Sequence, residues 1–225
     1  MKAIIFDSST IINFVMNGLI SMLKELKKEF NGKFLITEEV KHETIDRPLG
    51  IKKYELGALY VLELLKENVL ELPESIGLDS RLISRKSAEL LEKINHSFSS
   101  QREFIHLIDK GECSCLALSM LASEKKIDNI IAIDERTTRM LWEKPENLCK
   151  LMEKKLHTRI KFSTEKSPRM NAIKFIRSSE IAYIAWKKRL VHITEKRALE
   201  ALLYATKFKG ASISSEEIEE LKNIG

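Results

Sequence analysis

Five acidic residues lie where apolar stretches of the sequence end or where helices are expected to begin. They are Asp7, Glu43, Glu112, Asp134 and Glu135. Carboxylates gathered at one place repel one another and resist ionisation unless a cation compensates their charge. Magnesium and manganese prefer oxygen ligands, so an acidic site of this kind suits them and does not suit zinc. The chemistry that follows is metal-assisted hydrolysis of a phosphodiester bond, with a metal-activated water as the nucleophile.

Each of these acids also has a purely structural interpretation. Asp7 is suited to capping a helix, and Asp134 and Glu135 are suited to capping the helix that follows them. Glu43 taken alone is typical of a solvated helix surface. Glu112 taken alone is typical of a helix N-terminus, where a negative charge is favourable. Only the elements that position the acids decide between the two interpretations.

Apolar stretches alternate with amphipathic segments along the first two thirds of the chain. We expect strands at residues 3–6, 33–36, 69–72, 130–133 and 158–162. We expect helices at residues 20–30, from 37 onward, and at 51–68, 79–109, 111–126 and 136–156, with breaks near 95–100 and at 145. This alternation predicts an α/β fold, with a central parallel sheet covered by helices on both faces. Sites in such sheets form beyond the carboxyl ends of the strands, where Asp7 and Asp134 lie.

The pattern changes near the C-terminus of the sequence. After residue 163 we expect helices alone, at residues 171–190, 194–209 and 214–224. We therefore predict a domain over residues 1–162, with a helical insertion at 74–108. Residues 163–225 are predicted to form a helical extension that packs on this domain.

Composition limits the classes of protein to which the chain can belong. The 225 residues carry a net charge of +5. Residues 151–225 contain 16 Lys and Arg against 9 Asp and Glu, which gives +7 there and leaves −2 for residues 1–150. The three cysteines and five histidines form no spacing typical of a zinc or histidine-based site. The sequence contains no apolar stretch that predicts a membrane span and no signal segment, so we expect a cytoplasmic protein without membrane contact.

The sequence resembles the PIN-domain nucleases. The resemblance rests on the stretches IIFDSSTIINF, ITEEVKHETID, DKGECSCLALS and IIAIDERTTRML, which occur in this order over residues 1–161. The closing stretch ALLYATKFKGASISSEEIEEL also looks like the C-terminal helices of archaeal members. The resemblance implies a three-layer α/β/α fold, a Mg²⁺ or Mn²⁺ site and cleavage of single-stranded or structured RNA.

The resemblance also implies roles for individual residues. Asp7, Glu43, Glu112 and Asp134 are the expected metal-coordinating acids, and Ser9 occupies the usual hydroxyl position. Its hydroxyl is suited to holding a metal-bound water or orienting the carboxylate of Asp7. Many members carry Asp-Asp or Thr-x-Asp where this chain has Asp134 and Glu135, so which of the two binds metal stays open.

The expected partners are RNA and, for a toxin-like member of the family, a protein inhibitor of the antitoxin type. Other members process RNA, and many form homodimers. Lys110, Arg136 and Arg139 lie near the predicted site and are candidates for phosphate contacts. A second basic group near the C-terminus, close to Trp186, is a further RNA-binding candidate, or else a solvated helix surface. It consists of Lys187, Lys188, Arg189, Lys196 and Arg197.

Other functions compete with the nuclease interpretation. A phosphatase of the haloacid dehalogenase type requires a second aspartate two residues after the first, where this chain has Ser9. A ribonuclease H-like fold begins with hairpins, for which the sequence has no turn signals. No GxGxxG follows the first strand, which argues against a dinucleotide-binding domain. The main alternative is a catalytically silent domain of the same fold that binds RNA or a protein.

Overall fold

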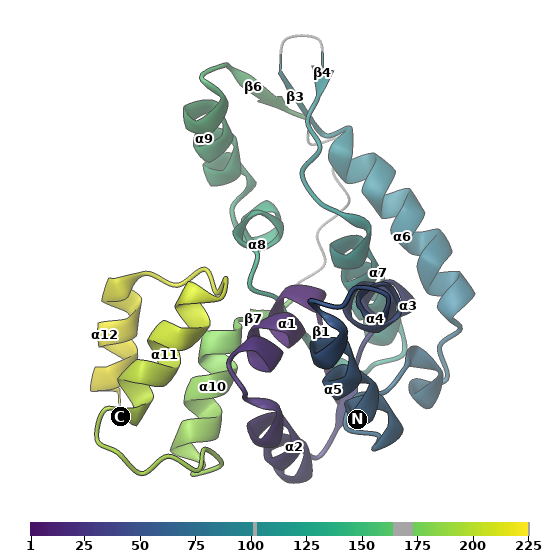
Figure 1. The fold of residues 1–225 in the computed structure, drawn as a ribbon. Helices are drawn as coiled ribbons and strands as arrows, with labels where there is room; N and C mark the ends of the chain where they lie inside the picture. The colour runs from purple at the N-terminus through teal and green to yellow at the C-terminus, as the bar shows by residue number, and fades with distance from the viewer. Residues whose placement is uncertain (101–102, 164–172, 225) are drawn as a thin grey trace.

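The centre of the protein is a four-stranded parallel sheet. In the computed structural model, which describes residues 1–100, 103–163 and 173–224, its strands are β1 (Lys2–Phe6), β2 (Lys33–Leu35), β5 (Asp128–Ala132) and β7 (Phe175–Ile176). They are ordered β2-β1-β5-β7, and every described pairing in this sheet is parallel. Ile5 lies opposite Ile131, and both are fully buried. The predicted α/β fold with a parallel sheet is therefore confirmed (Figure 1).

The C-terminal segment contributes a strand as well as helices. Residues 175 and 176 were expected in a helix, but they form β7 and pair with Ile131 and Ala132 of β5. Residues 171 and 172 lie outside the described part of the chain. The expectation of helices alone after residue 163 is therefore wrong, because the exposed edge of β5 gives this short segment a pairing partner that local sequence does not reveal.

Helices formed by the segments between and after the strands surround the sheet. Between β1 and the arm described below, they are α1 (Ser8–Met16), α2 (Ile20–Glu29), α3 (Glu38–Lys41), the π-helical turn η1 (His42–Asp46), α4 (Arg47–Leu49), α5 (Glu55–Lys66) and the 3₁₀ turn η2 (Pro73–Ile76). The later ones are α7 (Lys110–Glu124), α10 (Ser178–Lys187), α11 (Ala198–Phe208) and α12 (Ser215–Asn223). The strand expected at residues 69–72 is reduced to one parallel bridge, between Leu35 and Glu71.

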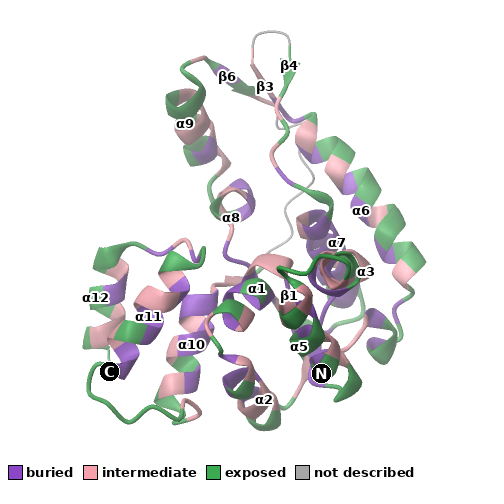
Figure 2. Cartoon of the chain, in the orientation of Figure 1, coloured by how far each residue is buried: buried purple, intermediate pink, exposed green. Residues whose placement is uncertain are grey.

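Helix α7 is the most deeply buried helix in Figure 2, and it packs against β1 and β5. Its small residues allow this close packing: Gly111, Cys113, Cys115 and Ala117 are all buried. The two cysteines are free thiols within the core, as expected for reduced structural cysteines. In the described ranges, no helix combines the length and apolar character needed to cross a membrane.

A second, smaller sheet lies apart from the first, at the tip of a projection that we call the arm (Figure 1). The arm consists of α6 (Ser80–Asn95), β3 (Phe98–Ser100), β4 (Glu103–Phe104), α8 (Arg136–Glu143), α9 (Pro145–Leu156) and β6 (Ile160–Phe162). Its three strands are antiparallel in the order β4-β3-β6.

The arm corrects two details of the sequence prediction. Residues 79–109 form one helix followed by a pair of short strands, rather than two helices, so the insertion at 74–108 is only partly helical. The strand expected at 158–162 is present as β6 but belongs to the arm. The break expected at Pro145 is confirmed, since α8 ends at Glu143 and α9 begins at Pro145.

Candidate metal-binding site

Asp7 lies directly after β1 and is both a helix cap and a member of the acidic site. Its Oδ2 accepts hydrogen bonds from the backbone N–H of Ser9 at 3.1 Å and from the Ser9 hydroxyl at 2.6 Å. Its Oδ1 is buried and has no hydrogen-bond partner among the described residues. Burial, with a contribution from the nearby Glu43 carboxylate, raises the pKa of Asp7 to about 6. A buried acceptor without a donor favours either a proton or a cation.

Glu112 lies in the first turn of α7, and its Oε2 accepts the backbone N–H of Asp109 at 3.0 Å, which completes a capping box. Burial, with smaller contributions from the charges of Asp7 and Glu135, raises the pKa of Glu112 to about 8 against the opposing effect of that hydrogen bond. Asp109 is exposed and serves as the N-cap of α7. At neutral pH the side chain of Glu112 is therefore protonated in this arrangement.

Glu43 reaches the same place from the π-helical turn η1. A Cβ atom added to Gly111 would lie only 2.8 Å from both carboxylate oxygens of Glu43. The missing side chain of Gly111 therefore leaves the room that the Glu43 carboxylate occupies beside α7. Single π-helical turns are unusual and are often found at functional sites.

Substitution of Gly111 by alanine tests this contact. Alanine is favoured over glycine in helices, so we expect the melting temperature to stay the same or rise slightly. The added methyl group must displace the Glu43 carboxylate, so we expect metal-dependent cleavage of RNA to fall at least about tenfold, the effect expected from misplacing a catalytic group by about 1 Å. The measurements are thermal melting and the cleavage rate, with Gly57→Ala as the control: Gly57 lies in α5, against Val15 of α1. Equal cleavage by Gly111→Ala and the wild type would contradict the predicted role of this contact.

Asp134 and Glu135 follow β5, but their side chains meet different partners. Asp134 is buried, and its Oδ1 accepts the backbone N–H of Ser178 at 2.8 Å, while its Oδ2 accepts the side-chain amide of Asn13 at 2.9 Å. Burial raises its pKa, and these hydrogen bonds oppose the shift. The carboxylate of Asp134 is thus held by the C-terminal segment and by α1.

Glu135 is the acid of this pair that bears on the acidic site. Its charge raises the pKa of Glu112, whereas Asp134 is not among the main causes of that shift. Its Oε2 accepts the backbone N–H of Thr138 at 2.7 Å, so Glu135 also caps α8. We call Asp7, Glu43, Glu112 and Glu135 the acidic cluster.

Ser9 connects the two strand ends. Its hydroxyl donates to Asp7 and accepts the backbone N–H of Asp134 at 3.3 Å. The backbone N–H of Asp7 in turn donates to the carbonyl of Ala132 at 2.9 Å. These bonds hold the carboxyl ends of β1 and β5 together, as a parallel sheet requires for a shared site.

The basic residues expected near the site divide into two groups. Lys110 and Arg136 are exposed at the starts of α7 and α8, next to Glu112 and Glu135, and remain available for phosphate contacts. Arg139 is not free for such a contact in this structure. It donates to the carbonyl and hydroxyl oxygens of Ser212 at 3.3 and 3.2 Å.

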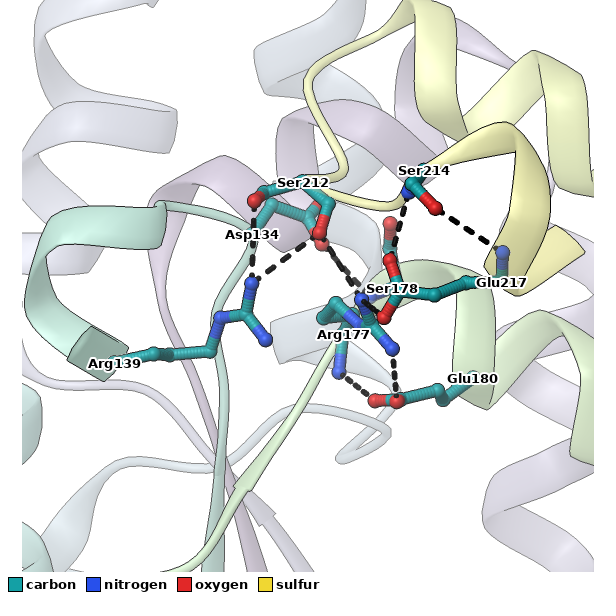
Figure 3. A network of polar contacts seen from close by, with 8 residues as sticks. All are labelled: Asp134, Arg139, Arg177, Ser178, Glu180, Ser212, Ser214 and Glu217. Carbon is teal, nitrogen blue, oxygen red and sulfur yellow. Dashed lines mark hydrogen bonds and ion pairs between the residues drawn. The ribbon is translucent and has the colours of Figure 1, made fainter. Parts of the chain in front are cut away.

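Figure 3 shows the network in which Arg139 takes part. Arg177 also donates to the Ser212 carbonyl, at 3.1 Å, and forms ion pairs with Glu180 and Glu217. The backbone N–H of Ser212 donates to the carbonyl of Asp134 at 3.3 Å. The loop between α11 and α12 is thereby fastened to the carboxyl end of β5.

Sequence reasoning did not identify the residues that hold this end of the sheet. Asn13 is fully buried, and its amide joins Asp134 to the carbonyl of Thr206 in α11 at 2.8 Å. A polar residue on the apolar side of α1, between Ile11 and Phe14, was the available signal. Ser178 and Ser212 carried no such signal, because they act through backbone groups.

The second basic group lies at the end of α10 and in the segment that leads from α10 to α11, and it is exposed. Lys187 lies over the ring of Tyr183, and Lys188 lies 3.9 Å from Glu29. Trp186 and Tyr183 are partly buried against the hydrophobic core, whereas Ile184 is exposed. This arrangement favours a packed helix with a solvated charged side.

The oxygen donors of the acidic cluster fit a hard divalent cation in chemical type, and the unpartnered Oδ1 of Asp7 is an acceptor available to one. Their present placement is not a complete coordination shell. Among the residues that the structure describes, no three His, Cys, Asp or Glu side chains are grouped closely enough to hold a metal ion. Glu112 and Glu135 each use one oxygen as a helix cap and keep the other for a cation. Because the described acids are not grouped closely enough to share an ion, binding of a cation requires side-chain movement.

Compared with family models, with curated proteins and with solved structures, the chain has no match.

Proposed function

We propose that this protein is a metal-dependent endoribonuclease that hydrolyses RNA phosphodiester bonds at the acidic cluster, as an RNA-processing nuclease or a toxin-like ribonuclease. The observation that carries the proposal is the buried Oδ1 of Asp7, which has no hydrogen-bond partner among the described residues although acids from other elements lie near it. Burial and the charges of Asp7 and Glu135 raise the pKa of Glu112 in α7 to about 8. Burial and the charge of Glu43 raise the pKa of Asp7 to about 6. A protein that bound no cation here would gain stability by losing these charges.

In this proposal Asp7, Glu43, Glu112 and Glu135 hold Mg²⁺ or Mn²⁺, with Glu135 taking the place first expected for Asp134. The bound ion lowers the pKa of a water molecule and stabilises negative charge on phosphate oxygens. Ser9 orients Asp7 through its 2.6 Å hydrogen bond. Glu112 releases its proton when a cation binds, and the exposed Lys110 and Arg136 contact phosphates beside the cluster.

The second candidate is a catalytically silent module of the same fold that binds RNA or a protein. One observation favours it, namely that the acids of the described chain are not grouped as a ready coordination shell. The two candidates differ in their response to a metal. The silent module predicts RNA binding that is indifferent to Mg²⁺ and no measurable affinity for Mn²⁺.

The deciding experiment is Mn²⁺-dependent cleavage of a mixed panel of single-stranded and structured RNAs, with a chelator control. We expect cleavage by the wild type and at least about a hundredfold loss in Asp7→Asn, because removing a group that stabilises developing charge has effects of this size. Asn is a good helix cap, so the variant keeps α1 intact. The matched control is Asp109→Asn, since Asp109 is exposed and caps the neighbouring helix α7. Absence of both cleavage and calorimetric Mn²⁺ binding in the wild type would refute the nuclease proposal.

A further inference from the structure

The arm rises from the same edge of the parallel sheet as the acidic cluster (Figure 1). One side of the arm begins at Glu135, which caps α8 and leads through α9 to β6. The other side returns from β4 to Lys110 and Glu112 at the start of α7. Two acids of the cluster therefore lie at the base of the arm. A polymer bound at the cluster meets the arm as the next surface.

The side of the arm formed by α9 and β6 carries a concentrated positive charge. Residues 144–161 contain six Lys and Arg and two Glu, and 6 − 2 gives a net charge of +4. We call the basic residues the arm cations: Lys144, Lys150, Lys154, Lys155, Arg159 and Lys161. All six are exposed. One of the two glutamates, Glu153, accepts the backbone N–H of Ile160 at 3.0 Å and so joins α9 to β6.

The arm cations differ from many other basic residues of the chain in having no acidic partner within the part of the chain that the structure describes. Lys24, Lys27, Lys33 and Lys222 all lie in ion pairs with glutamates, as does Arg177. None of the ion pairs found among the described residues includes an arm cation. Unpaired, exposed cations on one surface attract a polyanion and release its counterions on binding.

The arm presents these charges in two ordered rows. Lys150 and Lys154 lie one turn apart on α9, on the same side of the helix. Arg159 directly precedes β6, Lys161 lies within it, and both are exposed. Lys161 lies on the exposed face of the strand, since successive strand residues alternate. The opposite face of β6 packs inward, with the ring of Phe162 at 4.6 Å from that of Phe98.

A membrane surface fits this side of the arm poorly. An interfacial helix needs a free apolar side to insert between lipids. Most of the apolar side of α9 is occupied, since Leu148 is buried and Cys149 and Met152 pack against the core. Leu156 at the end of the helix is exposed, but one leucine is not an apolar side that could insert between lipids. Binding of a phosphate backbone requires only the exposed positive charges, without a free apolar side.

We propose that the exposed side of α9 and β6 binds the phosphate backbone of RNA that extends from the cleavage point at the acidic cluster. This inference rests on the proposed nuclease function for the identity of the polyanion. The arm cations position the RNA and take no part in hydrolysis. Substrates are then RNAs long enough to contact both the cluster and the arm.

The test is RNA binding by the full chain in the presence of a chelator, which separates binding from cleavage. The arm variant carries Lys150→Ala, Lys154→Ala, Arg159→Ala and Lys161→Ala. The control variant loses the same charge from the end of α10 and the segment before α11, through Lys187→Ala, Lys188→Ala, Lys196→Ala and Arg197→Ala. Fluorescence anisotropy with a labelled RNA of about 25 nucleotides, longer than the roughly 4–16 nucleotides that one small single-strand-binding fold covers, gives the dissociation constant at several salt concentrations. Melting curves verify that both variants are folded.

We expect the arm variant to bind at least about tenfold more weakly and its salt dependence, as a log–log slope, to fall by about 3, at 0.7 for each of four phosphate contacts. The control variant should bind like the wild type. Equal weakening in both variants, or wild-type binding by the arm variant, would overturn the proposal. Competition by duplex DNA as effective as competition by RNA would overturn the assignment to RNA. Arm-dependent binding without any cleavage by the wild type would reject the nuclease and retain the arm as an RNA-binding surface.

Discussion

Glu112→Gln is expected to stabilise the protein at pH 8 while abolishing metal-dependent cleavage. The pKa of Glu112 is about 8 in the folded protein and 4.5 in its ordinary state. Because the folded-state pKa is raised, the contribution of Glu112 to stability is fully present below pH 4.5 and is lost as the pH rises to about 8. Glutamine carries no charge, so the variant avoids this loss. The gain at pH 8 is at most about 5 kcal/mol, since one pKa unit corresponds to about 1.36 kcal/mol.

Chemical denaturation at pH 4, 6 and 8 measures this gain, which should be near zero at the lowest pH and largest at the highest. The control is Glu124→Gln, at the exposed C-terminal end of the same helix, where removal of the charge should change stability little at any pH. Glutamine retains an acceptor for the backbone N–H of Asp109, so the capping box survives the substitution. A variant that loses stability at pH 8 would show that favourable contacts of the Glu112 carboxylate outweigh the cost of its burial and of the neighbouring charges.

Asp134→Asn is expected to lower the stability of the protein, whereas Glu135→Gln is expected to lower the cleavage rate, although the two residues are adjacent. Both carboxylate oxygens of Asp134 accept N–H groups, from Ser178 and Asn13. An asparagine at position 134 has only one acceptor oxygen. Its NH₂ group must therefore face one of these two N–H donors and cannot form a hydrogen bond with it. Asn13 cannot turn its amide without losing its bond to Thr206. We expect Asp134→Asn to lower the free energy of unfolding by about 3 kcal/mol, the cost of a buried polar group left without its partner.

Glu135→Gln should leave stability nearly unchanged, because glutamine keeps an acceptor for the Thr138 N–H that caps α8. The same substitution removes a charge from the acidic cluster, so cleavage should fall by about a hundredfold or more. Denaturation curves and cleavage rates, measured on both variants and normalised to folded protein, separate the two roles. If Asp134→Asn instead loses cleavage while keeping wild-type stability, Asp134 is the metal ligand and Glu135 is only a cap.

The parallel sheet was predictable because short apolar stretches of the sequence are enough to indicate its longer strands. The apolar stretches that become β1 and β5 each end at an acid, and the rule that parallel strands share a carboxyl edge brings Asp7 near Glu135. Helix caps were also local, as at Thr37, whose hydroxyl accepts the backbone N–H of Val40. The small residues of α7 likewise indicated close packing against the sheet.

What the sequence concealed depends on contacts between distant segments. The carboxylate of Asp134 is held by Asn13 and Ser178, which are 121 and 44 residues from Asp134 along the chain. Strand β7 is two residues long and exists only because β5 offers an unpaired edge. The small sheet of the arm also depends on contacts between distant segments, since β3 pairs with β6 across more than fifty residues of sequence. Neither has a periodic pattern long enough to recognise.

The bonds around Asn13 and Asp134 also determine when the candidate site is completed during synthesis. A ribosome makes Asp7 and Asn13 first, and Asp134 follows more than a hundred residues later. The donors and acceptors that complete their contacts, at Ser178 and Thr206, are made later still. A nascent chain that has exposed all four cluster acids thus still lacks the strand and helix that fix the sheet edge. If the proposed nuclease activity depends on that edge, the growing chain is inactive toward the messenger RNA from which it is being translated until α11 has emerged.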